Sequence, residues 1–486
     1  MEKLISRIIN IVFIIVFSFI LLGGLFYKNQ VFMPEHQIFV IFSTVLWFLI
    51  LFFGYKFINK INIKKSNMIL ILMFFAFFLL QLFFAYMLRV YPTWDFGGVY
   101  YVALNYVDVG NFDLYKLYPN NYFLAYCFGF FYKIISIFGI SKFFRLSIIL
   151  NIFLIDSSIF LVYLVVKKLL NVNAALFSAL MCLCSTPFLL YTPIFYSDTL
   201  TMFIPILMVY IVILLDETNS KKKQFLLILF LVLLAFVGYK IKASILVVIV
   251  AIIIYWLFRD RRLKEGLSKF GIFLLIFVFI VSSFSLIEKN VILKDARKSG
   301  IVFPITHWIM MGLNSDTNIY GGFLPQDVDI TNNSEDKVYT NIAIIKSRIS
   351  ERKFLGNLHF YARKIVDTWC DGTYFAPEKL SRKPVEENFL HQFVLNKGNY
   401  FDILFCVSTG YILALYLFMV FAAILKRNDN KFNYILLLQC ILLGIWLFLL
   451  IWETRSRYLV NFVPLMIVLA TLSLNLIYEK INVNNK

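Results

Sequence analysis

Long apolar segments alternate with short polar connections along most of the chain. Apolar runs of about twenty residues recur, each long enough to cross the ~30 Å hydrocarbon core of a bilayer as an α-helix. A closed membrane barrel would show short alternating segments instead. Spans are predicted at 4–26, 37–58, 68–88, 146–166, 174–190, 199–215, 224–240, 243–258, 268–287, 403–425, 432–452 and 457–478. We therefore expect an all-α polytopic membrane protein, a bundle of about twelve transmembrane helices.

Segment 120–140 is also apolar, and loop charge decides whether it crosses. Short loops rich in Lys and Arg lie on the cytoplasmic side of membrane proteins. The strongest basic markers are "NKINIKK" (59–65), "KK" (167–168), "KKK" (221–223), "RDRRLK" (259–264) and "KRNDNK" (426–431). All of them fall inside, with both termini cytoplasmic, only if 120–140 lies along the outer surface. Gly129, Lys133 and Gly139 within the segment also favour an interfacial helix.

This topology divides the chain into five regions. They are three N-terminal spans (1–88), a first large outer loop with juxtamembrane helices (89–145), six central spans (146–287), an extracytoplasmic cap loop (288–402) and three C-terminal spans (403–486). The cap loop is polar, mixed in charge and too long for a simple connector. Its aromatic residues, Trp308 and Trp369 among them, indicate a folded cap rather than a disordered tail.

Composition supports the membrane interpretation. Of the 486 residues, 61% are hydrophobic and 15% are charged, whereas a soluble protein carries roughly 25% charged residues. Much of the +18 net charge lies in short loops, so it indicates orientation and contact with membrane lipids, and no nucleic acid partner. The high Lys, Asn, Ile and Phe content suggests an AT-rich genome, and hence the plasma membrane of a low-GC Gram-positive bacterium.

The predicted topology gathers scattered ionisable residues at the outer ends of the spans. Asp95 stands between Trp94 and Phe96 in "YPTWDFGGVYY", just outside the third span. The others are Arg145, Asp198, Lys240, Lys242, Glu453, Arg455 and Arg457. Such groups are costly at span ends unless they are paired or functional. A carboxylate that faces several cations suggests a reaction centre, because cations stabilise an anionic leaving group and the carboxylate accepts the proton of an attacking hydroxyl.

The acidic residues and the histidine also have structural interpretations. Asp95 could cap a short outer helix that begins at Phe96, and Asp198 could cap the sixth span. His307, in "FPITHWIMMGLN", could be a buried structural residue.

The basic residues have structural interpretations too. Lys240 and Lys242 could extend along apolar surface to place their ammonium groups at the membrane interface. Arg455 and Arg457 could pair only with Glu453 and with lipid headgroups. The argument for a functional site is that the predicted topology places all these residues on the same, outer face of the membrane.

With those residues placed, the chain resembles the GT-C glycosyltransferases. The similarity is greatest to bacterial relatives of the dolichyl-phosphate-mannose–protein mannosyltransferases and of the lipid A aminoarabinose transferase. The strings that carry the resemblance are "TWDFGGVYYVA", "FRLSIILNIFLI", "TPIFYSDTLTMF", "GYKIKASIL" and "ETRSRYLVNFVP". The outer strings "THWIMMGLN" and "DTWCDGTYFAP" are similar to those of Gram-positive members.

The resemblance implies inverting transfer of a sugar from a polyprenyl-phosphate donor to an extracytoplasmic glycan, teichoic acid, lipid or protein. Asp95 would be the general base. The implied donor-phosphate contacts are Lys240, Lys242, Arg455 and Arg457, and the implied supporting or substrate residues are Trp94, Tyr100, Arg145, Asp198, Glu453 and His307. Many mannosyltransferase members carry adjacent acidic residues in the first outer loop, whereas Phe96 follows Asp95 here. No metal ligands are therefore assigned, and a divalent metal is not indicated.

Two other functions fit a multispan protein with outer charges. A transporter or flippase of lipid-linked glycans would place ionisable residues near the bilayer midplane and build discontinuous spans in paired halves. A polysaccharide polymerase or ligase would take a polymer on polyprenyl diphosphate. The charges here cluster at the outer face and the chain shows no two-half symmetry, which disfavours the transporter, and the Asp-bearing first outer loop favours monosaccharide transfer over the polymerase or ligase.

Overall fold

The computed structural model describes residues 2–26, 36–61, 66–110, 118–259, 263–288, 303–317, 319–425 and 432–484. These residues form helices and loops, and their β-type pairing is limited to one isolated bridge between Val90 and Pro384. Ten of the described helices are long and apolar enough to cross a membrane. The expected all-α polytopic membrane architecture is confirmed.

The ten long helices follow the predicted spans closely. They are α1 (Glu2–Phe26), α2 (Gln37–Ile58), α3 (Ser66–Met87), α6 (Phe143–Leu169), α9 with α10 (Ser197–Leu200 and Phe203–Glu217), α11 (Lys221–Ile241), α13 (Leu263–Ile287), α20 (Phe401–Ile424), α21 (Phe432–Ile451) and η6 with α22 (Ser456–Phe462 and Val463–Asn484). Parts of two basic loops used to orient the bundle, 62–65 and 260–262, and the whole of a third, 426–431, lie outside the described residues.

Two predicted spans are shorter than expected. Span 174–190 is α7 (Val172–Leu183) followed by the single turn α8 (Pro187–Leu190). Pro187 has no amide hydrogen to donate to the carbonyl of Leu183, four residues earlier, and its ring would clash with that carbonyl, which accounts for the end of α7 at Leu183. Span 243–258 consists of η4 (Ala243–Ile245) and α12 (Leu246–Arg259), and its apolar part reaches only ~24 Å at 1.5 Å per residue. Hence ten, rather than twelve, of the described helices have spanning length.

Segment 120–140 forms α5 (Tyr122–Ile137), which packs against α4 (Trp94–Val109). Each has 16 residues, about 24 Å of helix. Both are shorter than the ten long helices, as are α7 and α12, and the juxtamembrane placement of 120–140 stays a prediction.

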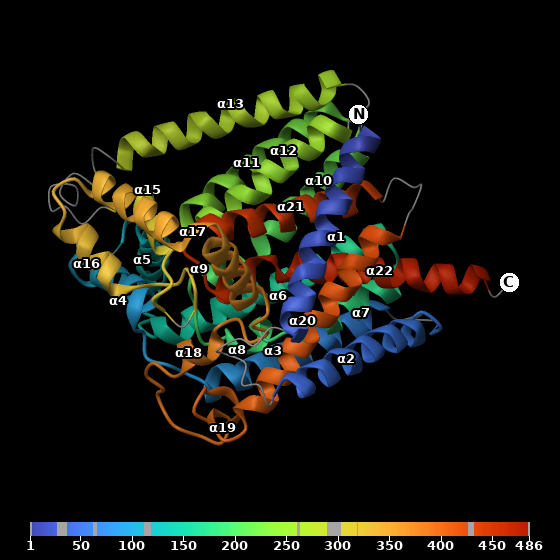
Figure 1. Ribbon diagram of the computed structural model, residues 1–486, viewed down its shortest axis with the longest axis horizontal. Coiled ribbons are helices and arrows are strands. Elements are labelled where there is room, and N and C mark those ends of the chain that lie inside the picture. Colours follow the sequence, from blue (N-terminus) through green and yellow to red (C-terminus); the bar gives the residue numbers. More distant parts are fainter. Residues whose placement is uncertain are drawn as a thin grey trace.

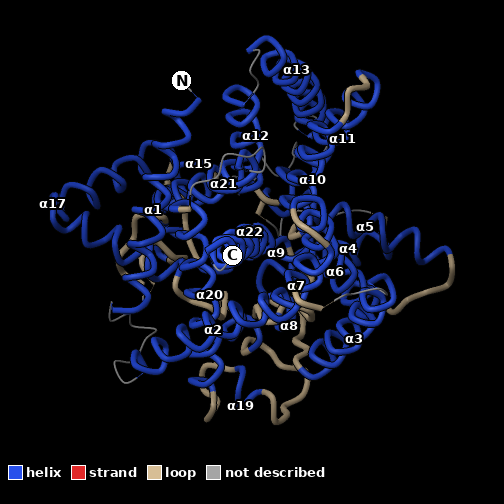
Figure 2. The backbone as a smooth tube through the Cα atoms, turned by 90° about the vertical axis from the view of Figure 1, so that its right-hand side faces the viewer, coloured by secondary structure: helices blue, strands red, loops and turns tan. Residues whose placement is uncertain are grey.

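The C-terminal helix α22 forms the centre of the bundle (Figure 2), where it is seen end-on among α6, α7, α10, α20 and α21. Of the most apolar 18-residue stretch of this last span, 94% is buried, whereas the corresponding share in α13, at the edge of the bundle, is 6%. The residues of η6, just before α22, therefore lead directly into the buried centre of the bundle.

The helices between α13 and α20 form a cap, which lies on the left in Figure 1, away from the end of α22. They are α15 (Ile305–Met311), α16 (Pro325–Asn333), α17 (Lys337–Trp369), α18 (Ala376–Leu380) and α19 (His391–Val394). Helix α17 is broken at Lys353, where φ is 53°. A bidentate ion pair from Arg348 to Asp327, at 2.7 and 2.9 Å, ties α17 to α16. The cap is thus folded, as its composition predicted.

Lys364 on α17 fastens the cap to the turn that follows α21. Its buried ammonium donates to the carbonyl oxygens of Gly312 (2.6 Å), Leu450 (2.9 Å) and Trp452 (2.9 Å). Burial lowers the pKa of Lys364 to about 7. The three acceptors favour the ammonium form, because only that form has three N–H bonds to donate.

Replacing Lys364 with methionine (Lys364→Met) should weaken this attachment, since three carbonyl oxygens would lose their donor. Each buried group left unsatisfied costs about 1–3 kcal/mol. We expect a lower melting temperature and faster limited proteolysis of the cap in detergent. Lys346→Met, at an exposed position of the same helix, is the matched control. Equal stability of the two variants would contradict the proposed clamp.

Candidate functional site

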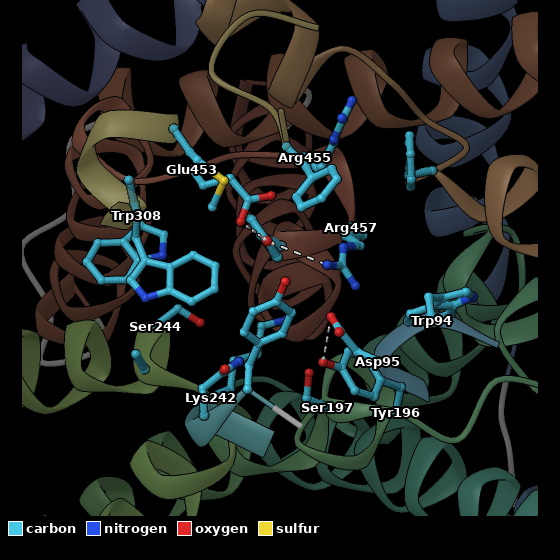
Figure 3. Close-up of a pocket in the computed structure, with 18 of the residues that line it drawn as sticks. Trp94, Asp95, Tyr196, Ser197, Lys242, Ser244, Trp308, Glu453, Arg455 and Arg457 are labelled. Atoms are coloured by element: carbon cyan, nitrogen blue, oxygen red, sulfur yellow. Dashed lines mark hydrogen bonds between the residues drawn. The ribbon is translucent and has the colours of Figure 1, made fainter. Parts of the chain in front are cut away.

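A cavity of about 480 Å³ lies between the cap and the ends of the long helices (Figure 3). Its size falls in the ~300–1,000 Å³ range of small-molecule sites. Seven of the residues chosen from the sequence line it: Trp94, Asp95, Lys242, His307, Glu453, Arg455 and Arg457. They come from α4, from the turns after α11 and α21, from α15 and from η6.

Four other predicted residues do not line the cavity. Asp198 is buried behind its wall. Lys240 pairs with Glu288 at 2.6 Å instead of facing the cavity. Tyr100 packs among aromatic rings, with Phe195 at 5.8 Å between centroids, and Arg145 is exposed on α6. These positions give Lys240, Tyr100 and Arg145 no direct contact with a ligand in the cavity.

The turn before α4 places Asp95 on the cavity wall. Helix α4 starts at Trp94, with Thr93 at the N-cap position, so Asp95 lies in the first turn and is not the cap. Gly97 lies against the preceding turn, because a Cβ there would come within 2.7 Å of the Pro92 carbonyl. Trp94 has φ 47°, in the left-handed region. A residue other than glycine in this region costs about 1–3 kcal/mol of backbone strain, and this conformation is kept where the surrounding structure holds the backbone in place.

Among the described residues, the Asp95 carboxylate has a single, long hydrogen-bond contact. The Tyr196 hydroxyl lies 3.5 Å from Asp95 Oδ2 and donates a shorter hydrogen bond, 2.8 Å, to Asn121 Oδ1. Asp95 forms no ion pair with another described residue. Its oxygens are therefore available to accept a proton or a hydrogen bond from a ligand.

Asp198 holds two cations at the base of the cavity. Its carboxylate pairs with the Lys242 ammonium and, at 3.4 Å, with Arg457 Nη1. The loop before it is shaped by Asn151 on α6, whose amide donates to the carbonyls of Tyr191 (2.9 Å) and Thr192 (3.0 Å). Asp198 is thus an ion-pair partner and not a helix cap, and Arg457 pairs with it rather than with Glu453.

The turn 452–455 joins the cavity to the cap. The Glu453 amide donates to the Trp308 carbonyl at 3.0 Å, and the Thr454 amide to that of Gly321 at 2.8 Å. Glu453 accepts from the Tyr458 hydroxyl at 2.9 Å. The Arg455 guanidinium lies so close to Gly322 that a Cβ there would come within 2.7 Å of Arg455 Cζ.

Two further cations line the cavity that the sequence pattern did not predict, Lys379 on α18 and Arg382 just after it. Both come from the basic string "EKLSRK", which follows the quoted "DTWCDGTYFAP". The segment reaches the site because it is bonded to the chain before α4: the Tyr91 amide donates to the Lys383 carbonyl, and the Val385 amide to that of Arg89, both at 2.9 Å. Nothing in the local pattern around Lys379 signals this long-range pairing.

The charges around the cavity do not balance. Five cations line it (Lys242, Lys379, Arg382, Arg455 and Arg457) together with two carboxylates (Asp95 and Glu453). The carboxylate of Asp198 behind the wall leaves an excess of two positive charges. An excess of positive charge in a semi-enclosed site favours an anionic ligand.

Aromatic rings form the opposite wall. Trp308 and Trp452 are stacked with centroids 6.4 Å apart, and Phe448 lies 5.2 Å from Trp452. All three line the cavity. The Trp308 ring lies across the cavity from Asp95 and Arg457 (Figure 3), and the three rings make that side of the cavity apolar.

His307 has a defined hydrogen-bonding state. Its Nδ1 lies 2.8 Å from Thr331 Oγ1, whose own hydrogen is directed to the carbonyl of Asp327 (2.9 Å) or the amide oxygen of Asn341 (3.0 Å). The hydroxyl therefore accepts from Nδ1–H, which leaves Nε2 with a lone pair. That atom is buried and has no partner among the described residues. Burial lowers the pKa of His307 to about 4, so the ring is neutral at pH 7.

The lowered pKa predicts a pH dependence of stability. Between about pH 6.5 and 4 the unfolded His307 binds a proton that the folded one does not, so stability falls as the pH drops through that window. His307→Asn should show a smaller loss of melting temperature between pH 7.5 and pH 5 than the unsubstituted protein. His359→Asn, at an exposed position, should keep the full loss. Identical pH profiles for the two variants would contradict the assignment.

Long apolar helices and a charged cavity beneath a polar cap define a polytopic integral membrane protein with a pocket at one end of its bundle. The described residues contain no group of three or more His, Cys, Asp or Glu side chains arranged to hold a metal ion. Over residues 1–477 the chain matches the family described as conserved hypothetical integral membrane protein, and it belongs to that family. No curated protein and no solved structure matches it.

Proposed function

We propose that this protein is a GT-C-type membrane glycosyltransferase of the cell membrane. It transfers a sugar from a polyprenyl-phosphate donor to a hydroxyl of an extracytoplasmic acceptor. One observation supports the proposal. The same cavity is lined by the Asp95 carboxylate, which forms no ion pair with a described residue, and by an excess of cations. These are the two groups that a transfer reaction with an anionic leaving group needs.

Asp95 is the general base in this reaction. Its carboxylate takes the proton of the acceptor hydroxyl as the hydroxyl oxygen attacks the anomeric carbon of the donor sugar. The bond from that carbon to the phosphate oxygen breaks, and polyprenyl phosphate leaves with the electron pair. Attack opposite the leaving group inverts the configuration of the anomeric carbon.

Lys242, Arg455 and Arg457 bind the donor phosphate and stabilise the charge that develops on it. Lys242 follows α11 and Arg457 precedes α22, so both stand at helix ends, where a lipid-linked phosphate arrives from the bilayer. The stacked Trp308 and Trp452 rings offer an apolar surface to the sugar ring. Glu453 and His307 are positioned to bind sugar hydroxyls on the same side.

The test is a donor panel. The purified full-length protein in nanodiscs is incubated with several polyprenyl-phosphate sugars, and the release of polyprenyl phosphate is measured by mass spectrometry. Release with at least one donor, slowed about 10²-fold or more by Asp95→Asn, supports the proposal. If no donor is cleaved, with or without candidate acceptors, the proposal fails.

One observation favours a transporter as the second candidate. Asp156 lies at the middle of the 27-residue α6, and its Oδ1 is buried without a partner among the described residues. An ionisable side chain at this depth is a common feature of ion and substrate pathways. Flipping of a lipid-linked glycan across proteoliposomes without donor cleavage, lost in Asp156→Asn, would favour this second function.

A further inference from the structure

Lys379 and Arg382 form a second cationic position in the cavity, which the proposed donor contacts do not use. The Lys379 ammonium lies 3.4 Å from the centroid of the Trp94 ring, and the Arg382 guanidinium lies 5.6 Å from it. Lys379 is 4% exposed. Neither forms an ion pair with another described residue, so the indole face is the main contact that stabilises the buried ammonium.

Lys242 and Arg457 differ from Lys379 in having an ion-pair partner, although the Arg457 guanidinium also lies 5.9 Å from the centroid of the Trp94 ring. Those two share the Asp198 carboxylate, which offsets part of their charge. At Lys379 burial lowers the pKa well below its usual value, and the nearby Arg457 and Arg382 lower it further. A buried group of like charges is costly unless an opposite charge joins it. The Lys379–Arg382 position is therefore suited to an anion that arrives with a ligand.

The two positions also differ in their place in the fold. Lys242 and Arg457 stand at the ends of α11 and α22, whereas Lys379 and Arg382 belong to α18 and the segment that pairs with residues 89–91. Asp95 lies near both positions. It directly follows Trp94, whose ring contacts the Lys379 ammonium. Its carboxylate also lies 3.5 Å from the hydroxyl of Tyr196, and Tyr196 stands two residues before Asp198 in the chain. Asp95 is therefore linked to both positions, through Trp94 in the chain and through Tyr196 in space.

We propose that Lys379 and Arg382 bind an oxyanion, phosphate or carboxylate, carried by the acceptor close to its reactive hydroxyl. The assignment rests on the proposed glycosyltransferase function and narrows its acceptor to an anionic polyol. The donor phosphate occupies the other position, at Lys242 and Arg457. An uncharged acceptor would leave Lys379 and Arg382 without a counter-charge.

The experiment measures binding rather than transfer. Full-length protein is placed in nanodiscs of phosphatidylcholine, and calorimetry follows its titration with glycerol 3-phosphate, glycerate, glycerol and farnesyl phosphate. We expect glycerol 3-phosphate, glycerate or both to bind, and glycerol not to bind. Lys379→Gln/Arg382→Gln should weaken oxyanion binding at least tenfold while the affinity for farnesyl phosphate stays within twofold.

Lys383→Gln is the matched control, because Lys383 is an exposed cation of the same segment whose ammonium lies 5.4 Å from the Tyr91 ring. It should leave both affinities unchanged. If Lys379→Gln does not fold, the single variant Arg382→Gln, at an exposed position, carries the test. Nanodiscs with phosphatidylglycerol show whether a lipid headgroup competes for the position, which would identify a lipid as the anionic acceptor.

The inference is overturned if neither oxyanion binds better than glycerol, or if the double variant loses farnesyl phosphate as strongly as glycerol 3-phosphate. Both outcomes can be distinguished from a failure of the glycosyltransferase proposal. That proposal falls when no donor is cleaved, whatever the soluble ligands do in calorimetry.

Discussion

Asp95→Asn is expected to slow sugar transfer by about 10²–10⁴-fold, the usual contribution of a general base. Asparagine has nearly the same shape but cannot accept the proton of the acceptor hydroxyl. The 3.5 Å contact with Tyr196 is too long to contribute much to stability, so folding should be unaffected. The measurement is the initial rate of polyprenyl phosphate release with the best donor of the panel.

Asp108→Asn supplies the control for this experiment. Asp108 lies on the same helix α4, is exposed, and is absent from the cavity lining. It should retain full activity and the same elution profile as Asp95→Asn on size exclusion. Full activity of the Asp95 variant, or equal losses in both, would remove Asp95 from the reaction.

Asp198→Ala is expected to have the largest effect on stability. The substitution leaves the Lys242 ammonium and the Arg457 guanidinium near each other, with side chains only 9% and 12% exposed, and without the carboxylate that pairs with both. Breaking a buried pair on one side costs about 3–5 kcal/mol. We expect a clear drop in the melting temperature, measured by intrinsic tryptophan fluorescence in detergent.

A second substitution tests whether the loss of stability comes from the two cations left without their carboxylate. Lys242→Met removes one of the two unpaired charges, so Asp198→Ala/Lys242→Met should be more stable than Asp198→Ala alone. Asp402→Asn, which breaks a pair with His36 at a side chain 60% exposed, should change stability by no more than about 1 kcal/mol. A melting temperature unaffected by Asp198→Ala would show that the buried network does not stabilise the fold.

Much of the fold was accessible from the sequence, because a membrane span is a local property. Twenty apolar residues in succession predict a spanning helix wherever they occur, and most of the ten long helices begin and end within a few residues of the predicted limits. The shorter helices α7 and α12 were harder, because apolar composition continues past the Pro187 break and through the 3₁₀ turn η4. Hydropathy does not register a change of backbone direction.

The site was accessible only in part. Asp95, Lys242 and Arg457 were found because charges at span ends are rare enough to stand out. Arg145 and Lys240 matched the same rule, yet one is exposed and the other pairs with Glu288. Lys379 and Arg382 were missed because they stand in a polar loop where lysine and arginine are common. Only the pairing of residues 383–385 with 89–91 brings them to Trp94.

The central position of α22 bears on how the protein is made. Ribosomes deliver the helices in chain order, and among the described ones α22 comes last while occupying the middle. Until it inserts, the earlier helices surround an unfilled core, and the cavity lacks Arg455, Arg457 and Tyr458, which enter just ahead of it. A chain that stops short of residue 453 therefore lacks the central helix of the bundle and the part of the pocket wall that Arg455, Arg457 and Tyr458 form.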